Sequence, residues 1–333
     1  MKKLINSPEN VVREALEGIA LAHVDRVRVS LDPFYIARKD APVKGKVAVV
    51  SGGGSGHEPM QGGYVGFGGL DAACPGHVFT SPTPDQMFEA SKAVHGGAGV
   101  LHLFANYTGD IMNFDVSEEL LREEKIEVAR VLSDDDVAVQ NSLYTTGRRG
   151  VALTILLDKL VGAAAEAGMN LAQVKAFGDS IRATGRTMGM ALTSCTIPHV
   201  GKPIFELGDN EMEVGIGVHG EPGRQRLPIV SADEITEMLL EPVIADLPYK
   251  SGDNVILFVN GMGATPLIEL YIIYRKAAEI AAKHGLKVVR NLVGNYFTSL
   301  DMAGVSVTLL RADDNVVKMW DAPINTAALR WGI

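Results

Sequence analysis

Short apolar runs, most of them followed by glycine or a polar turn, recur along the whole chain. Runs of this length predict strands that are buried on both faces of a sheet. The glycines stand where a strand-to-helix turn needs backbone without a Cβ atom. The predicted strands cover residues 46–50, 99–104, 126–132, 255–259, 287–293 and 305–310.

Helical patterns lie between several of these strands. Residues 151–167 are rich in Ala and Leu, and residues 265–284 begin with Thr-Pro and are followed by Gly285. That order is expected of an N-cap, a first helical residue and a C′ glycine. Residues 227–247 are expected to form a further helix flanked by loops. Helices that alternate with strands predict an α/β protein.

The length of 333 residues is about twice that of an average domain, so two domains are expected. Residues 194–208 carry prolines without helical periodicity and are expected to form a connection. We predict two α/β domains, residues 1–185 and 186–333, with largely parallel or mixed central sheets flanked by helices.

Composition and charge narrow the class of protein. Hydrophobic residues make up 47% and charged residues 21% of the chain, as in globular proteins. The net charge of -9, without clustered cations, argues against nucleic acid as a partner. The N-terminus lacks the apolar core of a signal peptide, and the apolar runs are too short to span a membrane. Cys74 and Cys195 form no CxxC pair, so a reducing, cytoplasmic location is expected.

The glycine-rich segment SGGGSGHEP at 51–59 directly follows the predicted strand 46–50. Such a turn at the carboxyl end of a parallel strand presents backbone N–H groups to a ligand. The segment lacks the Lys of a P-loop, and His57 occupies the last glycine position of GxGxxG, so nucleotide binding is disfavoured. The glycines alone fit a tight turn without a ligand, and His57 shifts the balance toward a small polar ligand.

His219 lies in the segment MEVGIGVHGEPG at 212–223. If this segment is a strand, Gly215 and Gly217 share the face of His219 and leave a hollow beside the imidazole. The alternative is a histidine that ends a strand whose glycines allow a bend, and the pattern alone favours neither.

Asp110 follows the predicted strand 99–104, at the end of the segment FANYTGD. Taken singly, an Asp in this position is typical of a helix N-cap. However, three strand ends now offer His57, Asp110 and His219. Functional side chains of α/β folds collect at such ends, so we expect these three to form one site.

The other candidate residues receive structural interpretations. The run 134–136 of three aspartates is expected to form a solvated surface or a helix start. The remaining histidines have no HxxxH, HxH or Cys-paired spacing, so no metal site is predicted. Neither Ser51 nor Ser55 has a GxSxG context, which argues against an esterase.

At these residues the sequence resembles the sugar-binding subunit of dihydroxyacetone kinase, nearly from end to end. The matching segments are SGGGSGHEPM at 51–60, CPGHVFTSPTPDQM at 74–87, NYTGDIMNF at 106–114, SDDDVAV at 133–139, YTTGRRGVA at 144–152, DNEMEVGIGVHGEPG at 209–223, GATPLIELY at 263–271 and TSLDMAGVSVTLL at 298–310.

The resemblance implies a homodimer of two-domain α/β subunits that binds a small ketose. The histidine matching His219 forms a covalent hemiaminal with the ketone carbon. His57 and Asp110 bracket the hydroxyl that is phosphorylated, and either could take its proton. Covalent capture also separates a ketone from glycerol better than a few hydrogen bonds would.

The glycine-rich loop, here Gly54, Ser55 and Gly56, binds the triose in the family. Some members fuse this unit to a helical nucleotide-binding domain. Others keep that domain as a separate subunit, whose ADP is recharged by the phosphotransferase system. Because 333 residues leave no room for the fused domain, we expect a partner subunit that carries ADP or ATP and Mg²⁺, and no cofactor in this chain.

One departure concerns the substrate. Many family members have a lysine immediately before NYTGD, where this chain has Ala105. The alternatives are a kinase subunit for a related ketose such as erythrulose, or a non-catalytic dihydroxyacetone-sensing coregulator of transcription. Retention of His57 and Asp110 favours a kinase, because sensing requires capture but no proton transfer. The glycine-rich segment 51–59 does not match the GxGxxG motif, which argues against an oxidoreductase.

Overall fold

The computed structural model describes residues 2–140, 145–247 and 249–333. Tyr144, with which the segment YTTGRRGVA begins, lies outside them. The chain divides into two compact units, each assembled from separated stretches. The first comprises Met1–Ser133, Leu156–Ser180 and Lys318–Ile333, and the second comprises Asp134–Ile155 and Ile181–Val317.

Each unit is built on a mixed six-stranded sheet with helices, which confirms the predicted α/β class. These two units do not correspond to two domains divided once after residue 185. Residues 134–155 group with the second unit and residues 318–333 with the first. The division into domains at that residue stays a prediction. Within the described residues, no helix is both long and apolar enough to cross a membrane.

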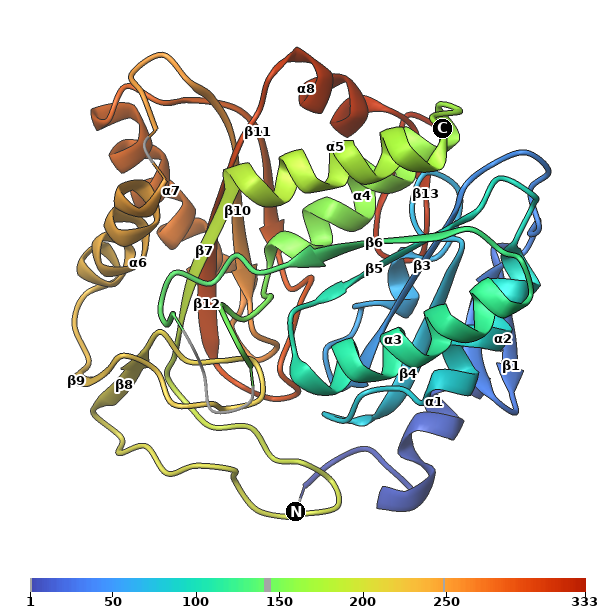
Figure 1. The fold of residues 1–333 in the computed structure, drawn as a ribbon. Coiled ribbons are helices and arrows are strands. Elements are labelled where there is room, and N and C mark those ends of the chain that lie inside the picture. Colours follow the sequence, from blue (N-terminus) through green and yellow to red (C-terminus); the bar gives the residue numbers. More distant parts are fainter. Residues whose placement is uncertain (1, 141–144, 248) are drawn as a thin grey trace. The chain divides into compact units, whose positions relative to one another are not determined.

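The sheet of the first unit has the order β1-β2-β4-β3-β5-β6. The strands β4, β3, β5 and β6 pair in parallel with one another, whereas β2 pairs antiparallel with both β1 and β4. Figure 1 traces these strands in blue and green. Their bounds are β1 Val27–Leu31, β2 Phe34–Arg38, β3 Ala48–Ser55, β4 Ala72–Val78, β5 Val100–Ala105 and β6 Val128–Ser133.

The helices α2 and α3 bury their apolar faces against this sheet. Phe104 of β5 and Phe114 of α3 are fully buried and stack with ring centroids 3.9 Å apart. Thr83 starts α2 through a capping box with Gln86. The further helices and short strands of this unit are η1 Pro8–Asn10, α1 Val11–Ala22, η2 Gly62–Tyr64, α2 Pro84–Val94, α3 Thr108–Glu123, most of α4 Leu153–Glu166 and α5 Leu171–Thr184, the end of α8 Asp314–Asp321, β13 Ile324–Asn325 and β14 Arg330–Trp331.

In the first unit, a buried network of charged side chains links the end of β2 to the starts of β3 and β4. The carboxylate of Asp71 accepts hydrogen bonds from Arg38 Nη1 at 3.1 Å, Lys46 Nζ at 2.5 Å and the Val49 N–H at 2.7 Å. Asp71 and Arg38 are each 2% exposed. Arg38 also binds the carboxylates of Asp40 and Glu166, whereas the other carboxylate near Lys46 is Glu166 at 3.9 Å, so Lys46 depends most on Asp71.

Replacing Asp71 by alanine is therefore expected to lower the free energy of unfolding by about 3 kcal/mol, because the buried Lys46 loses its near counter-charge and the Val49 N–H loses its acceptor. Urea titration followed by circular dichroism measures the change. Glu124→Ala removes a carboxylate that faces Lys92 on the surface at 4.0 Å and should cost less than about 1 kcal/mol. Equal losses for the two variants would contradict the prediction.

The sheet of the second unit has the order β11-β10-β12-β7-β8-β9. Only β10 and β11 are parallel, and the other neighbours are antiparallel. The bounds are β7 Gly185–Ala191, β8 Glu211–Val214, β9 Gln225–Pro228, β10 Asn254–Gly261, β11 Lys287–Gly294 and β12 Gly304–Arg311.

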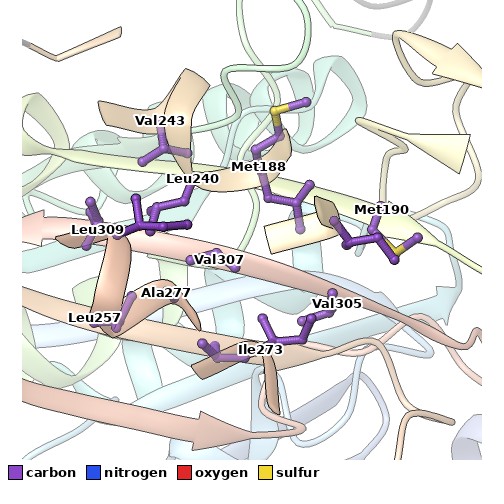
Figure 2. Close-up of a cluster of buried hydrophobic side chains, with 14 of the residues drawn as sticks. Met188, Met190, Leu240, Val243, Leu257, Ile273, Ala277, Val305, Val307 and Leu309 are labelled. Atoms are coloured by element: carbon purple, nitrogen blue, oxygen red, sulfur yellow. The ribbon is translucent and has the colours of Figure 1, made fainter. Parts of the chain in front are cut away.

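Two helices, α6 Ala232–Asp246 and α7 Leu267–Lys283, pack on one face of this sheet. Figure 2 shows the resulting core, in which Leu240 of α6 and Ala277 of α7 lie against the strand residues Met188, Leu257 and Val307. All of these side chains are at most 2% exposed. The alternation of apolar residues along the strands and their 3.6-residue period along the helices produce this layer.

The six predicted strands are confirmed, as β3, β5, β6, β10, β11 and β12. The predicted connection at 194–208 contains no named helix or strand. However, β1, β2, β4, β7 and β9 were not predicted, and the expectation of a helix from residue 227 was wrong at its start. Residues 225–228 form β9, and α6 begins only after the capping box between Ser231 and Glu234.

The predicted helices are confirmed with shifted starts. The helix predicted over 151–167 is α4, which begins at Leu153. In α7 the N-cap is Pro266 rather than Thr265, because the Thr265 hydroxyl instead donates to the Gly304 carbonyl at 2.6 Å. Gly285, with φ +73°, provides the expected left-handed residue after the helix.

Candidate active site

In the first unit, two predicted site residues follow neighbouring parallel strands. The strands β3 and β5 pair in parallel, with Ser51 opposite Leu103. His57 comes two residues after the end of β3, and Asp110 lies in the first turn of α3, just after β5. Because parallel strands end at the same edge of a sheet, this topology places both side chains at one edge.

The segment 79–82 lies against both strand ends. A Cβ atom on Gly54 would come within 2.7 Å of the Thr80 nitrogen, and one on Gly109 would come within 2.8 Å of Ser81 Oγ. The approach at Gly54 involves backbone atoms and requires glycine there, whereas a Cβ atom on Gly109 would displace the Ser81 hydroxyl. The segment therefore connects the glycine-rich end of β3 to the start of α3.

The glycine-rich segment 51–59 was predicted to be a turn, and this was wrong for its first half. β3 continues as a strand through Ser55, pairing with β4. The Ser55 hydroxyl donates to the Gly76 carbonyl at 2.7 Å, so toward a ligand it can only accept. The Gly56 N–H is bound by the Glu58 carboxylate at 3.0 Å.

His57 and Asp110 are both buried, with exposed fractions of 4% and 7%. The His57 ring stacks on Phe79, with centroids 4.9 Å apart and an angle of 15° between the planes, which fixes its orientation. Asp110 is the third residue of α3, whose N-cap is Tyr107, so the alternative of a simple N-cap is wrong. Its carboxylate nevertheless gains from the helix dipole.

A cavity of about 410 Å³ opens beside the same glycine-rich strand end. Gly54 and Ser55 form part of its wall, and Leu16 and Ile19 of α1 and Ile36 of β2 form apolar parts of it. His57 and Asp110 are not among the residues that line it, so this cavity shares only the glycine-rich strand end with the predicted site.

In the second unit, His219 stands on a turn rather than on a strand. β8 ends at Val214, and Gly215 has φ +80°, a left-handed conformation that stops the extended chain. Of the two alternatives that the pattern left open, the structure therefore agrees with a bend after the strand and not with a strand through His219. The neighbouring side chains of Ile216 and Val218 are each 3% exposed, whereas that of His219 is 26% exposed.

The expected hollow next to the His219 imidazole is filled. A Cβ atom on Gly217 would lie 2.0 Å from Glu221 Oε2 and 2.7 Å from Arg149 Nη1. The missing side chain thus makes room for two charged groups. The Glu221 carboxylate accepts the His219 backbone N–H at 2.9 Å and lies 3.1 Å from the ring Nδ1.

Glu221 is the strongest electrostatic feature of this turn, with an exposed fraction of 3%. Burial alone would raise the pKa of its carboxyl, but the His219 imidazole and the Arg149 guanidinium more than offset burial and lower the pKa to about 2. The carboxylate therefore stays ionised throughout the physiological range of pH.

The aspartate run 134–136 was predicted to be solvated or a helix start, and the first expectation was wrong. Asp135 and Asp136 are at most 2% exposed. Asp135 accepts the N–H groups of Val151 and Leu153 and so does cap the start of α4.

Asp136 binds the buried guanidinium of Arg149, whose Nε donates to its Oδ2 at 2.8 Å. Burial raises the pKa of Asp136 to about 6, and Arg149 opposes the rise.

The sequence analysis missed Glu221, Arg149 and Asp136. The one available signal was the pairing of an acidic run with the two arginines that follow it in the sequence.

His57 and Asp110 belong to the first unit and His219 to the second. Their roles, and the single site that all three were expected to form, stay predictions. Among the described parts of the chain, no group of three or more His, Cys, Asp or Glu side chains is placed to hold a metal ion.

The fold and these side chains define an α/β protein with a candidate site at strand ends and a histidine held by a buried carboxylate. The model of the Dak1 domain matches residues 17–328. The chain therefore belongs to the Dak1 domain family.

Named relatives agree with this assignment. The PEP-dependent dihydroxyacetone kinase, dihydroxyacetone-binding subunit DhaK, of Escherichia coli is 49% identical, with 100% of both chains covered. Among solved structures, the dihydroxyacetone kinase operon co-activator Dha-DhaQ matches with a TM-score of 0.89 and 33% identity, over 95% of this chain and 97% of that one. The dihydroxyacetone kinase of C. freundii in complex with AMP-PNP and Mg²⁺ matches with a TM-score of 0.88 and 30% identity, over 99% of this chain and 61% of that one.

Proposed function

We propose that this chain is the ketose-binding subunit of a multi-subunit dihydroxyacetone kinase. It captures dihydroxyacetone covalently on His219 and presents the terminal hydroxyl for phosphorylation by a nucleotide that another chain holds. The observation that carries this proposal is the end-to-end identity of 49% to a dihydroxyacetone-binding subunit of such a kinase. The partly open imidazole of His219 and the buried pair His57 and Asp110 supply the groups that the chemistry requires.

Capture and phosphoryl transfer make different demands on the protein. In capture, an imidazole nitrogen adds its lone pair to the ketone carbon, and the carbonyl oxygen takes a proton to become the hemiaminal hydroxyl. In transfer, the terminal hydroxyl loses its proton to His57 or Asp110 as it attacks the γ-phosphoryl group. Gly54, Ser55 and Gly56 at the end of β3 would position the triose.

The partner in this proposal is a helical subunit that holds ADP or ATP with Mg²⁺ and that is recharged by the phosphotransferase system. Two observations support a separate donor. The relative that matches over its full length is named a binding subunit, and the longer kinase, of which this chain spans 61%, was solved with AMP-PNP and Mg²⁺. We further propose that the chain forms a homodimer and acts in the cytoplasm.

Two alternatives remain open for the substrate and the role. Ala105 ends β5 with 5% exposure and replaces the lysine that many family members have there, which would favour a related ketose such as erythrulose. The structural match to an operon co-activator favours a dihydroxyacetone-sensing coregulator without turnover.

One assay separates these functions. The purified chain is mixed with the nucleotide-binding partner, a phosphate-donor system and either dihydroxyacetone or erythrulose, and sugar phosphate is measured. A dihydroxyacetone kinase subunit gives product with dihydroxyacetone at the higher kcat/KM. Preference for erythrulose would reassign the substrate, and binding without product from either ketose would identify a sensor.

A further inference from the structure

Glu221 contacts His219 at two points. One carboxylate oxygen lies 3.1 Å from the ring Nδ1, and the other accepts the backbone N–H of His219 at 2.9 Å. The Glu221 side chain is 3% exposed and the His219 side chain 26% exposed. A buried, ionised carboxylate thus holds one edge of a ring that is partly open to solvent.

This contact determines which ring nitrogen carries the proton. An ionised carboxylate only accepts hydrogen bonds, so Nδ1 of the neutral His219 ring must donate. The lone pair of the neutral imidazole is then on Nε2. Nε2 is therefore the nitrogen that is prepared to attack an electrophilic carbon.

The Arg149 guanidinium lies near the Glu221 carboxylate, since both would meet a Cβ atom on Gly217, and it is itself held by Asp136. Arg149 is fully buried, donates from Nε to Asp136 at 2.8 Å and from Nη2 to the Gly215 carbonyl at 2.8 Å, and lowers the pKa of Glu221 through its charge. Glu221, Arg149 and Asp136 are called the Glu221 cluster below. The Arg149 guanidinium forms its ion pair with Asp136. The negative charge of Glu221 therefore acts on the His219 imidazole.

We propose that Glu221, with the Arg149 guanidinium nearby, is a positioning residue that fixes the Nδ1–H tautomer of His219 and stabilises the positive charge that the ring acquires when it captures a ketone. This role rests on the proposed capture by His219. In the step itself, the Nε2 lone pair forms the N–C bond, and the π pair of the carbonyl moves to oxygen, which takes one proton from solvent. Nδ1 keeps its proton, and the resulting imidazolium faces the carboxylate.

Gly217 is part of the same arrangement. A Cβ atom there would overlap the carboxylate, at 2.0 Å from Oε2 and 2.6 Å from Cδ of Glu221. Gly217→Ala is therefore expected to move Glu221 away from His219 without removing any ionisable group. It serves as a second variant, in which all three side chains of the Glu221 cluster are kept.

The test compares Glu221→Gln with the unaltered chain, both carrying isotope-labelled histidine. The imidazole nitrogen chemical shifts report the tautomer of His219, and calorimetry reports the affinity for dihydroxyacetone. In the unaltered chain we expect the Nδ1–H form. In Glu221→Gln we expect a mixture of tautomers and a Kd that is higher by on the order of 10²-fold, as when a histidine loses the carboxylate that orients it.

Gly217→Ala should reproduce both changes if it folds, which circular dichroism and thermal unfolding establish for each variant. Glu211→Gln is the matched control, because it removes an exposed carboxylate 45% open to solvent near the same turn, and it should leave both readouts unchanged. If Glu221→Gln and Gly217→Ala fold but keep the Nδ1–H form and the original Kd, the proposed role of Glu221 is wrong.

The role of Glu221 and the capture by His219 can be refuted separately, by comparing His219→Ala with Glu221→Gln. Should His219→Ala bind dihydroxyacetone as tightly as the unaltered chain, then capture by His219 itself is refuted. Should His219→Ala abolish capture while Glu221→Gln has no effect, only the role of the Glu221 cluster is overturned.

Discussion

Asp110→Asn is expected to leave ketose affinity nearly intact while lowering kcat by on the order of 10²-fold or more. The carboxylate lies in the first turn of α3 at 7% exposure, at the sheet edge where the hydroxyl of a captured ketose would be bracketed. Asparagine keeps the shape and one acceptor oxygen of the side chain, but it cannot take a proton. Initial rates with saturating partner, together with calorimetric titration of dihydroxyacetone, measure the two quantities separately.

Asp115→Asn is the matched control for this prediction, because Asp115 lies on the same helix and its side chain is 51% exposed. It should change neither rate nor affinity. Equal losses of affinity and turnover in Asp110→Asn would make Asp110 a binding residue. A full loss of turnover in His57→Asn, with Asp110→Asn still active, would transfer the role of proton acceptor to His57.

The interior of the fold was predictable from the sequence because its signals are local. Apolar runs of five to seven residues mark the central strands, and Gly285 marks the end of α7, whereas the cap at Ser231 was overlooked. Edge strands such as β1 and β9 are amphipathic or exposed, and their pairing is set by long-range contacts. The discontinuous composition of the two units likewise depends on contacts between distant segments, which no local pattern records.

The candidate site residues were singled out only where they follow predicted strands. His57 and Asp110 each follow such a strand, and the structure shows that these strands, β3 and β5, are parallel neighbours, while the roles of the two side chains stay predictions. The surroundings of His219 were left open between a strand and a bend, because an alternating pattern cannot show that Gly215 adopts a positive φ and ends the strand. The gap above Gly217 then appeared as a hollow, although two charged side chains from 4 and 68 residues away fill it.

His219→Ala is expected to raise the Kd for dihydroxyacetone by on the order of 10³-fold or more and to abolish phosphorylation. Alanine removes the only nitrogen that the proposal uses to bond the ketone, and the remaining hydrogen bonds discriminate poorly among small polyols. His199→Ala is the control, because His199 is an exposed histidine in the same unit and should behave like the unaltered chain.

The clearest test of His219→Ala compares its affinities for dihydroxyacetone and for glycerol. The unaltered chain should bind dihydroxyacetone far more tightly than glycerol, because only a carbonyl carbon can form the bond to Nε2. In His219→Ala the two ligands should bind with similar, weak affinities, since both then depend on hydrogen bonds alone. Crystals soaked with dihydroxyacetone should show electron density continuous from the His219 ring to the ketose carbon. Separate density at van der Waals distance from the ring, or an undiminished preference for dihydroxyacetone in His219→Ala, would refute covalent capture.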